Sequence, residues 1–249
     1  MALRKIGASQ MRAALRLARP RASSLKAPAV AAASRGFSET SPFVPDVTTK
    51  FGDPSFWEGK YSSEYASRQE LEPFEWFLPY DGGLRQHLLP FLQSLPSCKR
   101  LLHVGSGTSE VGPELAKEAA LDVHVTDTDS SPSAVRIMKR RHAGLEGYTC
   151  HQTDVLNLPF PEGSFDAVVD KGTLDALLCS STEDALGMAA EVHRVLSKGG
   201  VFLQVTTEDP EARLDLLTRQ AQHTPWARSL FKEIGEGAES TYFMYVLVK

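Results

Sequence analysis

Short apolar runs, separated by polar stretches, recur along the chain from residue 101 onward. Five of them have the length of a strand buried on both faces: 101–104, 123–128, 148–152, 165–169 and 201–206. Between several of them lie helical patterns, at 132–141 and at 182–196, and the second of these ends at the glycine pair of 199–200. Strands that alternate with helices form a mostly parallel sheet with both faces covered. The pattern therefore predicts an α/β protein.

Two further apolar runs, 229–234 and 242–248, follow each other with only a short Gly/Glu/Ser connection. Such a connection is too short for a crossover helix, so the two runs should pair antiparallel. We expect them at the edge of the sheet, with the second run inside it. Upstream of the sheet, shorter helices are predicted at 54–61 and 84–93.

One stretch joins a strand, a glycine turn, a helix, a second strand and an acid. Gly105 and Gly107 follow the first strand, and Asp129 ends the second. Glycine permits torsions closed to other residues and lets a ligand lie against the main chain. The acid is placed to accept hydrogen bonds from ribose hydroxyls. The motif is incomplete, since Ser109 and Glu110 follow Thr108 where a third glycine would stand. Taken alone it could be a tight turn in an ordinary α/β domain.

The charge is unevenly distributed along the chain. The formal net charge is −4, yet residues 1–37 hold eight basic residues and no acid, so the remainder carries an excess of twelve acids. An acidic surface repels nucleic-acid phosphates and suits a basic protein partner. Residues 1–37 are also rich in Ala and Ser, and as a helix they would separate Leu3, Ile6 and Leu17 from the arginines.

That composition is typical of a mitochondrial transit peptide, with cleavage near Phe37, and predicts a location in the mitochondrial matrix. A disordered basic tail is the alternative. The expected organisation is a transit peptide at 1–37, a linker at 38–54, an aromatic helical segment at 55–99 and a ligand-binding domain at 100–249. No apolar run reaches the roughly 20 residues that a bilayer-spanning helix requires, so no membrane insertion is expected.

Metal and disulfide chemistry find little support in the sequence. The three cysteines form no CxxC pair, and the histidines show no HExxH spacing. Aromatic residues instead concentrate between positions 56 and 80. They could cap the end of the sheet or form a lid over a ligand, and both interpretations stay open.

The strand pattern, the Gly105–Gly107 turn, the segment from Asp154 to Phe160 and the segment from Gly163 to Asp166 resemble the class I S-adenosylmethionine-dependent methyltransferase family. The resemblance covers about residues 55–249 and implies a Rossmann-like, doubly wound sheet that is mostly parallel with an antiparallel C-terminal hairpin. It also implies S-adenosylmethionine as the cofactor. One departure is His103, where the family's glycine motif usually carries an acid.

Two further stretches are similar to a protein-lysine methyltransferase branch that modifies elongation factor 1 alpha and citrate synthase. They are 170–177, DKGTLDAL, and 208–214, EDPEARL. In that branch an N-terminal aromatic segment folds over the cofactor. The resemblance thus implies these cofactor contacts: Trp57, Tyr61, Trp76, Gly105, Gly107, Asp129, Ser130, Asp154, Val155 and Lys171. Asp127 is a nearby alternative to Asp129. The implied partner is a protein, with citrate synthase favoured.

Methyl transfer to a lysine needs alignment and exclusion of water, but neither a covalent nucleophile nor a metal. The amine must be neutral, so a nearby carboxylate could hold the ammonium before its proton leaves. Four acids follow the fourth and fifth strands on the side where ligands bind such sheets: Asp170, Asp175, Glu208 and Asp209. Each could equally be a helix cap or a solvated loop acid.

Several other functions compete with this interpretation. A lysine methyltransferase for another protein, such as an elongation factor, and a mitochondrial small-molecule methyltransferase would share the cofactor motifs. The sequence after strand four, 170–173, lacks an Asn/Asp-Pro-Pro-Tyr tetrapeptide, which argues against adenine or glutamine-amide acceptors. The missing third glycine disfavours a dinucleotide-dependent dehydrogenase. A non-catalytic cofactor-binding assembly factor differs from an enzyme only in measured methyl transfer.

Overall fold

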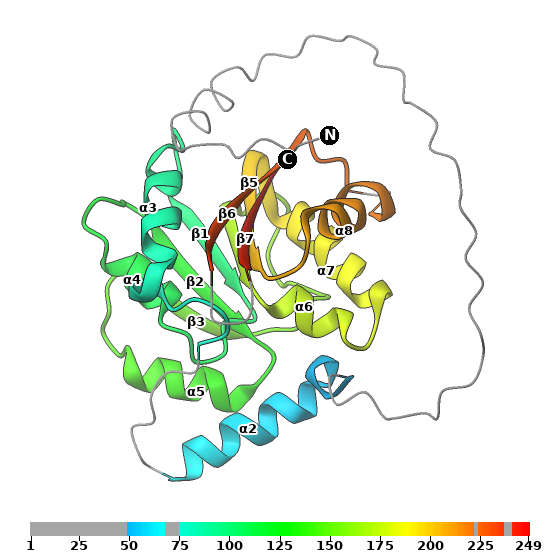
Figure 1. Cartoon of the computed structure of the whole chain (residues 1–249). Helices are drawn as coiled ribbons and strands as arrows, with labels where there is room; N and C mark the ends of the chain where they lie inside the picture. The colour runs from blue at the N-terminus through cyan, green and yellow to red at the C-terminus, as the bar shows by residue number, and fades with distance from the viewer. Residues whose placement is uncertain (1–48, 68–74, 222–223, 237–240) are drawn as a thin grey trace, which may run out of the picture.

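The computed structural model describes residues 49–67, 75–221, 224–236 and 241–249. Its core is one seven-stranded sheet in the order β3-β2-β1-β4-β5-β7-β6 (Figure 1). The strands are β1 (Arg100–Val104), β2 (His124–Asp129), β3 (Tyr148–Gln152), β4 (Phe165–Lys171), β5 (Leu196–Thr206), β6 (Arg228–Glu236) and β7 (Thr241–Val248). The strands β1 to β5 pair in parallel, and β7 pairs antiparallel with β5 and β6. The predicted fold class and the inner position of the last strand are confirmed.

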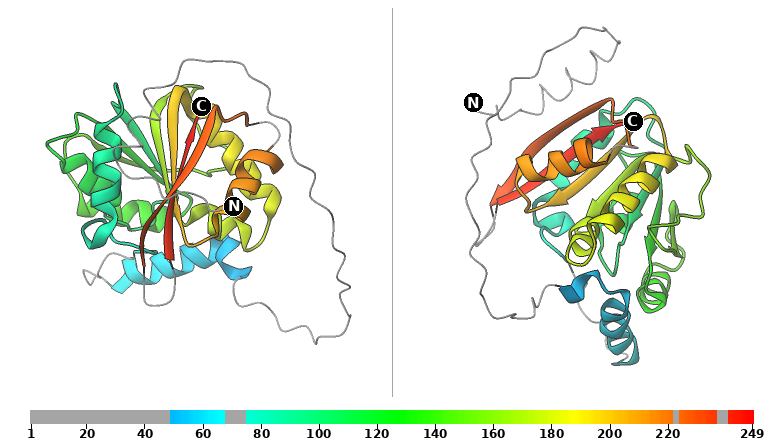
Figure 2. Two further views of the ribbon diagram at one scale, coloured as in Figure 1. Left: turned by 45° about the horizontal axis from the view of Figure 1, so that its top comes forward. Right: turned by 90° about the vertical axis from the view of Figure 1, so that its right-hand side faces the viewer.

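Helices cover both faces of the sheet (Figure 2). One face carries α3 (Arg85–Gln93), α4 (Val111–Lys117) and α5 (Pro132–Arg141). The other carries α6 (Thr173–Leu178), α7 (Thr182–Val195), α8 (Pro210–Leu214) and the π-helical turn η3 (Asp215–Gln220). Before them come the 3₁₀ turn η1 (Thr49–Gly52), α2 (Pro54–Ser67) and the π-helical turn η2 (Tyr80–Leu84). In Figure 1, α2 lies beside α5 at one end of the sheet.

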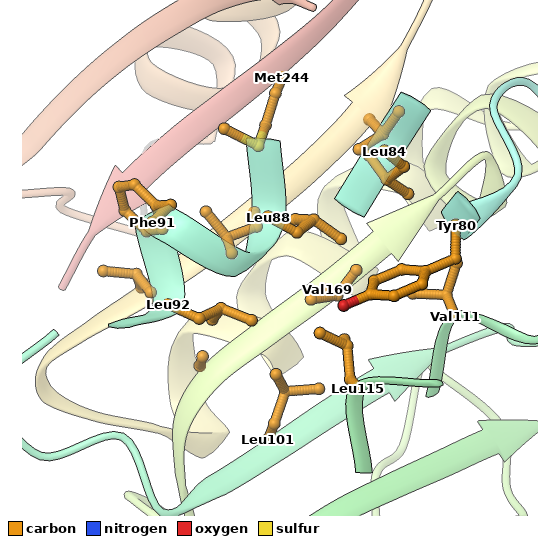
Figure 3. Close-up of a cluster of buried hydrophobic side chains, with 14 of the residues drawn as sticks. Tyr80, Leu84, Leu88, Phe91, Leu92, Leu101, Val111, Leu115, Val169 and Met244 are labelled. Atoms are coloured by element: carbon orange, nitrogen blue, oxygen red, sulfur yellow. The ribbon is translucent and has the colours of Figure 1, made fainter. Parts of the chain in front are cut away.

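Two hydrophobic cores, one per face, follow from the alternation of side chains along each strand. Leu101 of β1 lies in the core beneath α3 and α4, together with Leu88 and Leu115 (Figure 3). Its neighbour Leu102 lies in the opposite core with Met188 of α7. Because both cores are fully buried, the register of β1 is fixed: a slip by one residue would exchange the two faces.

The boundaries differ from expectation in three places. The helix predicted at 54–61 continues to Ser67, because nothing in its sequence stops it at Tyr61. The helix expected to end at the glycine pair of 199–200 ends at Val195, and the backbone is extended from Leu196. Gly199, with φ 78°, lies in an irregular stretch near the start of β5 and does not end a helix. The short helix α6 was not anticipated.

No helix in the described ranges is long and apolar enough to cross a membrane. Within the same ranges, no three His, Cys, Asp or Glu side chains gather as a possible metal site. The expected transit peptide at 1–37 and most of the expected linker at 38–54 lie outside the described residues.

Candidate functional site

The glycine turn after β1 lies against the start of α6. Gly105 and Gly107 adopt φ values of 56° and 54°, in the left-handed region that favours glycine. A Cβ on Gly105 would lie 2.0 Å from Oγ1 of Thr173. The Thr173 hydroxyl donates to the carbonyls of Val104, at 3.1 Å, and Gly105, at 3.3 Å. Thr173, whose role the sequence did not predict, therefore fixes the turn.

Asp129, at the end of β2, holds two neighbouring loops together. Its Oδ2 accepts a hydrogen bond from the backbone N–H of Gly107 at 2.8 Å, and its Oδ1 accepts one from Ser131 at 2.8 Å. Burial raises the pKa of this carboxyl against the lowering effect of both hydrogen bonds. Each oxygen accepts one of these bonds and retains capacity for another. Ser131, not Ser130, caps α5 by accepting from the N–H of Ala134 at 3.1 Å.

A cavity of about 500 Å³ crosses the carboxyl ends of β3, β2, β1 and β4. Its size is that of a typical small-molecule site. Most of the predicted contact residues line it: Trp57, Tyr61, Trp76, Gly105, Asp129, Ser130, Asp154, Val155 and Lys171. Gly107 is outside the lining but is bonded to Asp129. Because strand order sets the order of these groups, Asp154, Asp129, Gly105 and Lys171 follow one another along the edge.

Aromatic side chains from the N-terminal segment form one side of the cavity. The rings of Trp57 and Trp76 lie 5.4 Å apart, and the Trp57 ring stacks with that of Tyr61 at 6.1 Å. The Trp57 indole donates to the carbonyl of Phe51 at 2.8 Å. Tyr61 is buried, and a Cβ on Gly107 would lie 2.3 Å from its hydroxyl oxygen. These aromatics therefore pack against the glycine turn and the cavity together.

Lys171 anchors this segment to the sheet. Its Nζ lies 2.7 Å from Oε2 of Glu75 and donates to the carbonyl of Trp76 at 2.7 Å. The Lys171 side chain is only 2% exposed, and burial lowers its pKa although Glu75 acts in the opposite direction. The lysine reaches the cavity wall, but its charge is already matched.

Glu75 connects three parts of the fold and was not anticipated as a site residue. Besides Lys171, it accepts from the Ser109 hydroxyl at 2.8 Å and from the Glu110 N–H at 2.7 Å, where α4 begins. A second glutamate, Glu58 of α2, accepts from the Ser133 hydroxyl at 2.7 Å and from the Ser131 hydroxyl at the start of α5. Two carboxylates thus join the N-terminal segment to two helix N-termini, where negative charge is favoured.

None of the four acids predicted to follow the fourth and fifth strands lines the cavity, and Asp170 lies within β4, which extends to Lys171. Asp170 caps α6 by accepting from the Thr173 N–H at 2.8 Å, and burial followed by the nearby Asp175 charge raises its pKa to about 6. Asp209 caps α8, and Glu208 is exposed beside it.

Asp175 differs from the other three acids. Its Oδ1 binds Arg213 and Thr206, each at 2.6 Å, while its buried Oδ2 has no partner among the described residues. Burial raises its pKa, against the effect of the Arg213 charge. Asp175 therefore retains one unpaired carboxylate oxygen, which is buried and lies outside the cavity lining.

The chain is similar in sequence to a family of methyltransferases. Residues 102–204 match the family model described as a methyltransferase domain. The mitochondrial citrate synthase-lysine N-methyltransferase of Danio rerio is 30% identical over 232 residues, which cover 85% of this chain and 89% of that protein. EEF1A lysine methyltransferase 4 of Mus musculus is 32% identical over 183 residues, covering 70% and 68%.

Among solved structures, a SAM-dependent methyltransferase from Methanosarcina mazei superposes with a TM-score of 0.51 at 19% identity. The superposition covers 62% of this chain and 94% of that chain. At this identity the likeness concerns the fold alone.

Proposed function

Because the chain belongs to the class I S-adenosylmethionine-dependent methyltransferase family, we propose that it methylates a lysine side chain of citrate synthase in the mitochondrial matrix. The observation that carries the proposal is the cavity across the carboxyl edge of the sheet. It gathers an acid after β3, an acid after β2 and a glycine turn after β1 in one row. The substrate assignment is supported by the relatives of 30% and 32% identity, whose names describe protein-lysine methylation.

The residues around the cavity fit S-adenosylmethionine part by part. Asp154 is placed to accept from the adenine amine, and Asp129 from the ribose hydroxyls. The amino-acid end would then lie over the Gly105 turn, where glycine admits close approach. Ser106, which lines the cavity, has a buried hydroxyl with no partner among the described residues. An unpaired buried hydroxyl is costly, so a polar ligand group at this position would stabilise it.

When bound, the cofactor supplies a methyl group already activated by its sulfonium charge, so the protein has to position the acceptor and exclude water. We propose that Trp57, Tyr61 and Trp76 form the lid that excludes it, with Glu75 and Lys171 holding the lid closed. The acceptor lysine has a reference pKa of about 10.4. Its amine must therefore either enter the site already neutral or lose its proton there. Desolvation beneath an aromatic cover lowers that pKa.

Asp175 is our candidate for steering the acceptor ammonium, because its Oδ2 is unpaired. We expect Asp175→Asn to lower kcat on citrate synthase about 10- to 150-fold, the range of one hydrogen bond to a charged group. The affinity for S-adenosylhomocysteine should stay within about twofold. Mass spectrometry of citrate synthase, sampled over time, measures turnover, and Asp215→Asn removes a more exposed acid of the same region as a control.

Three results would change this assignment. Equal turnover in Asp175→Asn and wild type removes Asp175 from the acceptor site. Absence of added methyl mass on citrate synthase, with mass gained by elongation factor 1 alpha or another matrix protein, moves the substrate to that protein. Turnover insensitive to salt would contradict recognition through the acidic surface, because screening weakens exposed charge pairs.

A second expected outcome concerns location. Residues 1–37 fused to a fluorescent reporter should direct it to mitochondria, because the matrix potential attracts a basic amphipathic segment. Reversal of Arg12, Arg16 and Arg19 to Glu should abolish import, as seen by microscopy. The matched triple change to Lys keeps the charge and should import normally. Import of the Glu variant at the wild-type level would rule out the transit-peptide interpretation.

A further inference from the structure

A buried chain of three polar side chains lies beneath the cavity. Nδ1 of His103 on β1 lies 3.2 Å from Oδ1 of Asp127 on β2, and the Tyr148 hydroxyl on β3 donates to Oδ2 of the same aspartate at 2.9 Å. His103 is 1% exposed and Asp127 is fully buried. The register places His103 opposite Asp127, so the pairing is built into the sheet.

The hydrogen bonds of Asp127 determine the tautomer of His103. An ionised carboxylate only accepts, and both of its oxygens are engaged, one by the Tyr148 hydroxyl and one by His103. The His103 proton therefore belongs on Nδ1, which donates to Asp127. In the neutral ring, Nε2 is then an acceptor with a free lone pair. It has no partner among the described residues, and His103 lines the cavity.

The position of β1 shows which part of the ligand His103 meets. Along the sheet edge, β1 lies between β2, which ends at Asp129, and β4, which ends at Lys171. With ribose at Asp129, the next part of S-adenosylmethionine is its amino-acid end. That end carries an ammonium, which donates, and a carboxylate, which accepts. A bare imidazole nitrogen can bind only the first.

The surrounding charges favour the same group. Two carboxylates lie at this end of the cavity: Asp129 lines it, and Asp127 lies beneath it against His103. The nearby cation, Lys171, is bound to Glu75. The remaining charge is negative and attracts a cation. We propose that Nε2 of His103 accepts a hydrogen bond from the α-ammonium of the cofactor, with Asp127 as the positioning residue. The proposal rests on the cofactor and its placement in the proposed function, and not on the identity of the protein substrate.

The test is calorimetry of the full-length protein with three ligands. They are S-adenosylhomocysteine, its analogue without the α-amino group, and its analogue without the carboxylate. His103→Leu should lower the affinity for S-adenosylhomocysteine and for the decarboxylated analogue about 10- to 150-fold, the range of a charged hydrogen bond. The affinity for the deaminated analogue should stay within about twofold of the wild-type value. Asp127→Asn should weaken the two amine-bearing ligands selectively, because it no longer fixes the proton on Nδ1.

Each other outcome contradicts the assignment. Equal weakening of all three ligands would make His103 a structural residue, and selective loss of the two carboxylate-bearing ligands would assign it to the carboxylate. If His103→Leu does not fold, His103→Gln supplies an acceptor oxygen and should retain the preference for the amine, whereas loss of that preference overturns the proposal. Wild-type protein that binds none of the ligands would refute the cofactor site itself. Tight binding without methylation of citrate synthase would refute only the substrate.

Discussion

Replacement of Glu75 by alanine should destabilise the protein by about 3–5 kcal/mol, the usual result of removing one partner from a buried ion pair. Lys171 would keep a nearly inaccessible ammonium with only the Trp76 carbonyl beside it. The Ser109 hydroxyl and the Glu110 N–H would lose the same acceptor. Because the anchor of the aromatic segment is lost too, S-adenosylhomocysteine should bind more weakly. Urea unfolding and calorimetry measure the two effects.

The stability of Glu75→Ala should also depend on pH in a defined direction. Burial already lowers the pKa of Lys171, and removal of Glu75 takes away the largest influence that opposes this lowering. Between that lowered pKa and the unfolded value, the unfolded chain binds more protons than the folded one, so stability rises with pH. We expect this rise to be steeper than in the wild type over the pH interval just below the unfolded lysine value of about 10.4. A flat profile would show that Lys171 does not titrate in this interval.

Two controls distinguish the effect of breaking the buried Glu75–Lys171 pair from the effect of removing any charged side chain. Glu114→Ala breaks the exposed pair with Lys117, which should contribute about 0–1 kcal/mol. The double change Glu75→Gln with Lys171→Gln removes both charges, and should be less destabilised than Glu75→Ala because no charge is left buried alone. A Glu75→Ala protein as stable as Glu114→Ala would refute the anchoring role.

Replacement of Asp129 by alanine should weaken the binding of S-adenosylhomocysteine about 10- to 150-fold, because the proposed charged hydrogen bonds to the ribose are lost. The structure adds a second cost. Asp129 also accepts from the Gly107 and Ser131 N–H groups, so the variant releases the glycine turn and the start of α5. We therefore expect lower thermal stability in the free protein as well, measured by calorimetry and melting.

The conservative change Asp129→Asn distinguishes the two roles. Its single amide oxygen can keep one of the two backbone bonds, so stability should recover more than affinity does. Asp122→Ala is the matched control, since Asp122 is an exposed acid in the loop before β2 and pairs only with Lys99. Unchanged affinity in Asp129→Ala would move the ribose contact elsewhere, and Asp127 is then a poor alternative because it is fully buried and does not line the cavity.

The positions of the strands and the glycine turn at the ligand edge could be predicted from the sequence because local signals mark them. Apolar runs mark the strands, and the glycines at 105 and 107 mark a turn that few other residues can form. The short helix α6 gave no such signal: its six residues are fewer than two full turns, and its cap comes from Asp170, three residues before Thr173. Periodicity is not informative at this length.

The contacts that close the site could not be predicted for a different reason. Glu75 and Lys171 are 96 positions apart, and no local pattern relates them. Their pairing depends on how the aromatic segment crosses the sheet edge. The four acids predicted to follow the fourth and fifth strands illustrate the opposite case, in which position was predictable and contacts were not. Their place at the ligand side followed from topology, but whether an acid caps a helix, as Asp170 does, or keeps an oxygen free, as Asp175 does, depends on packing.

The inner place of β7 affects the order in which the chain can fold during synthesis. β6 leaves the ribosome before β7, yet β7 is the strand that joins it to β5. Until β7 arrives, β6 has no strand to pair with and β5 presents an open edge. Unpaired edges of this kind promote association between incomplete chains. The last sheet pairings are therefore all-or-none, and a chaperone that shields β5 and β6 would act in that interval.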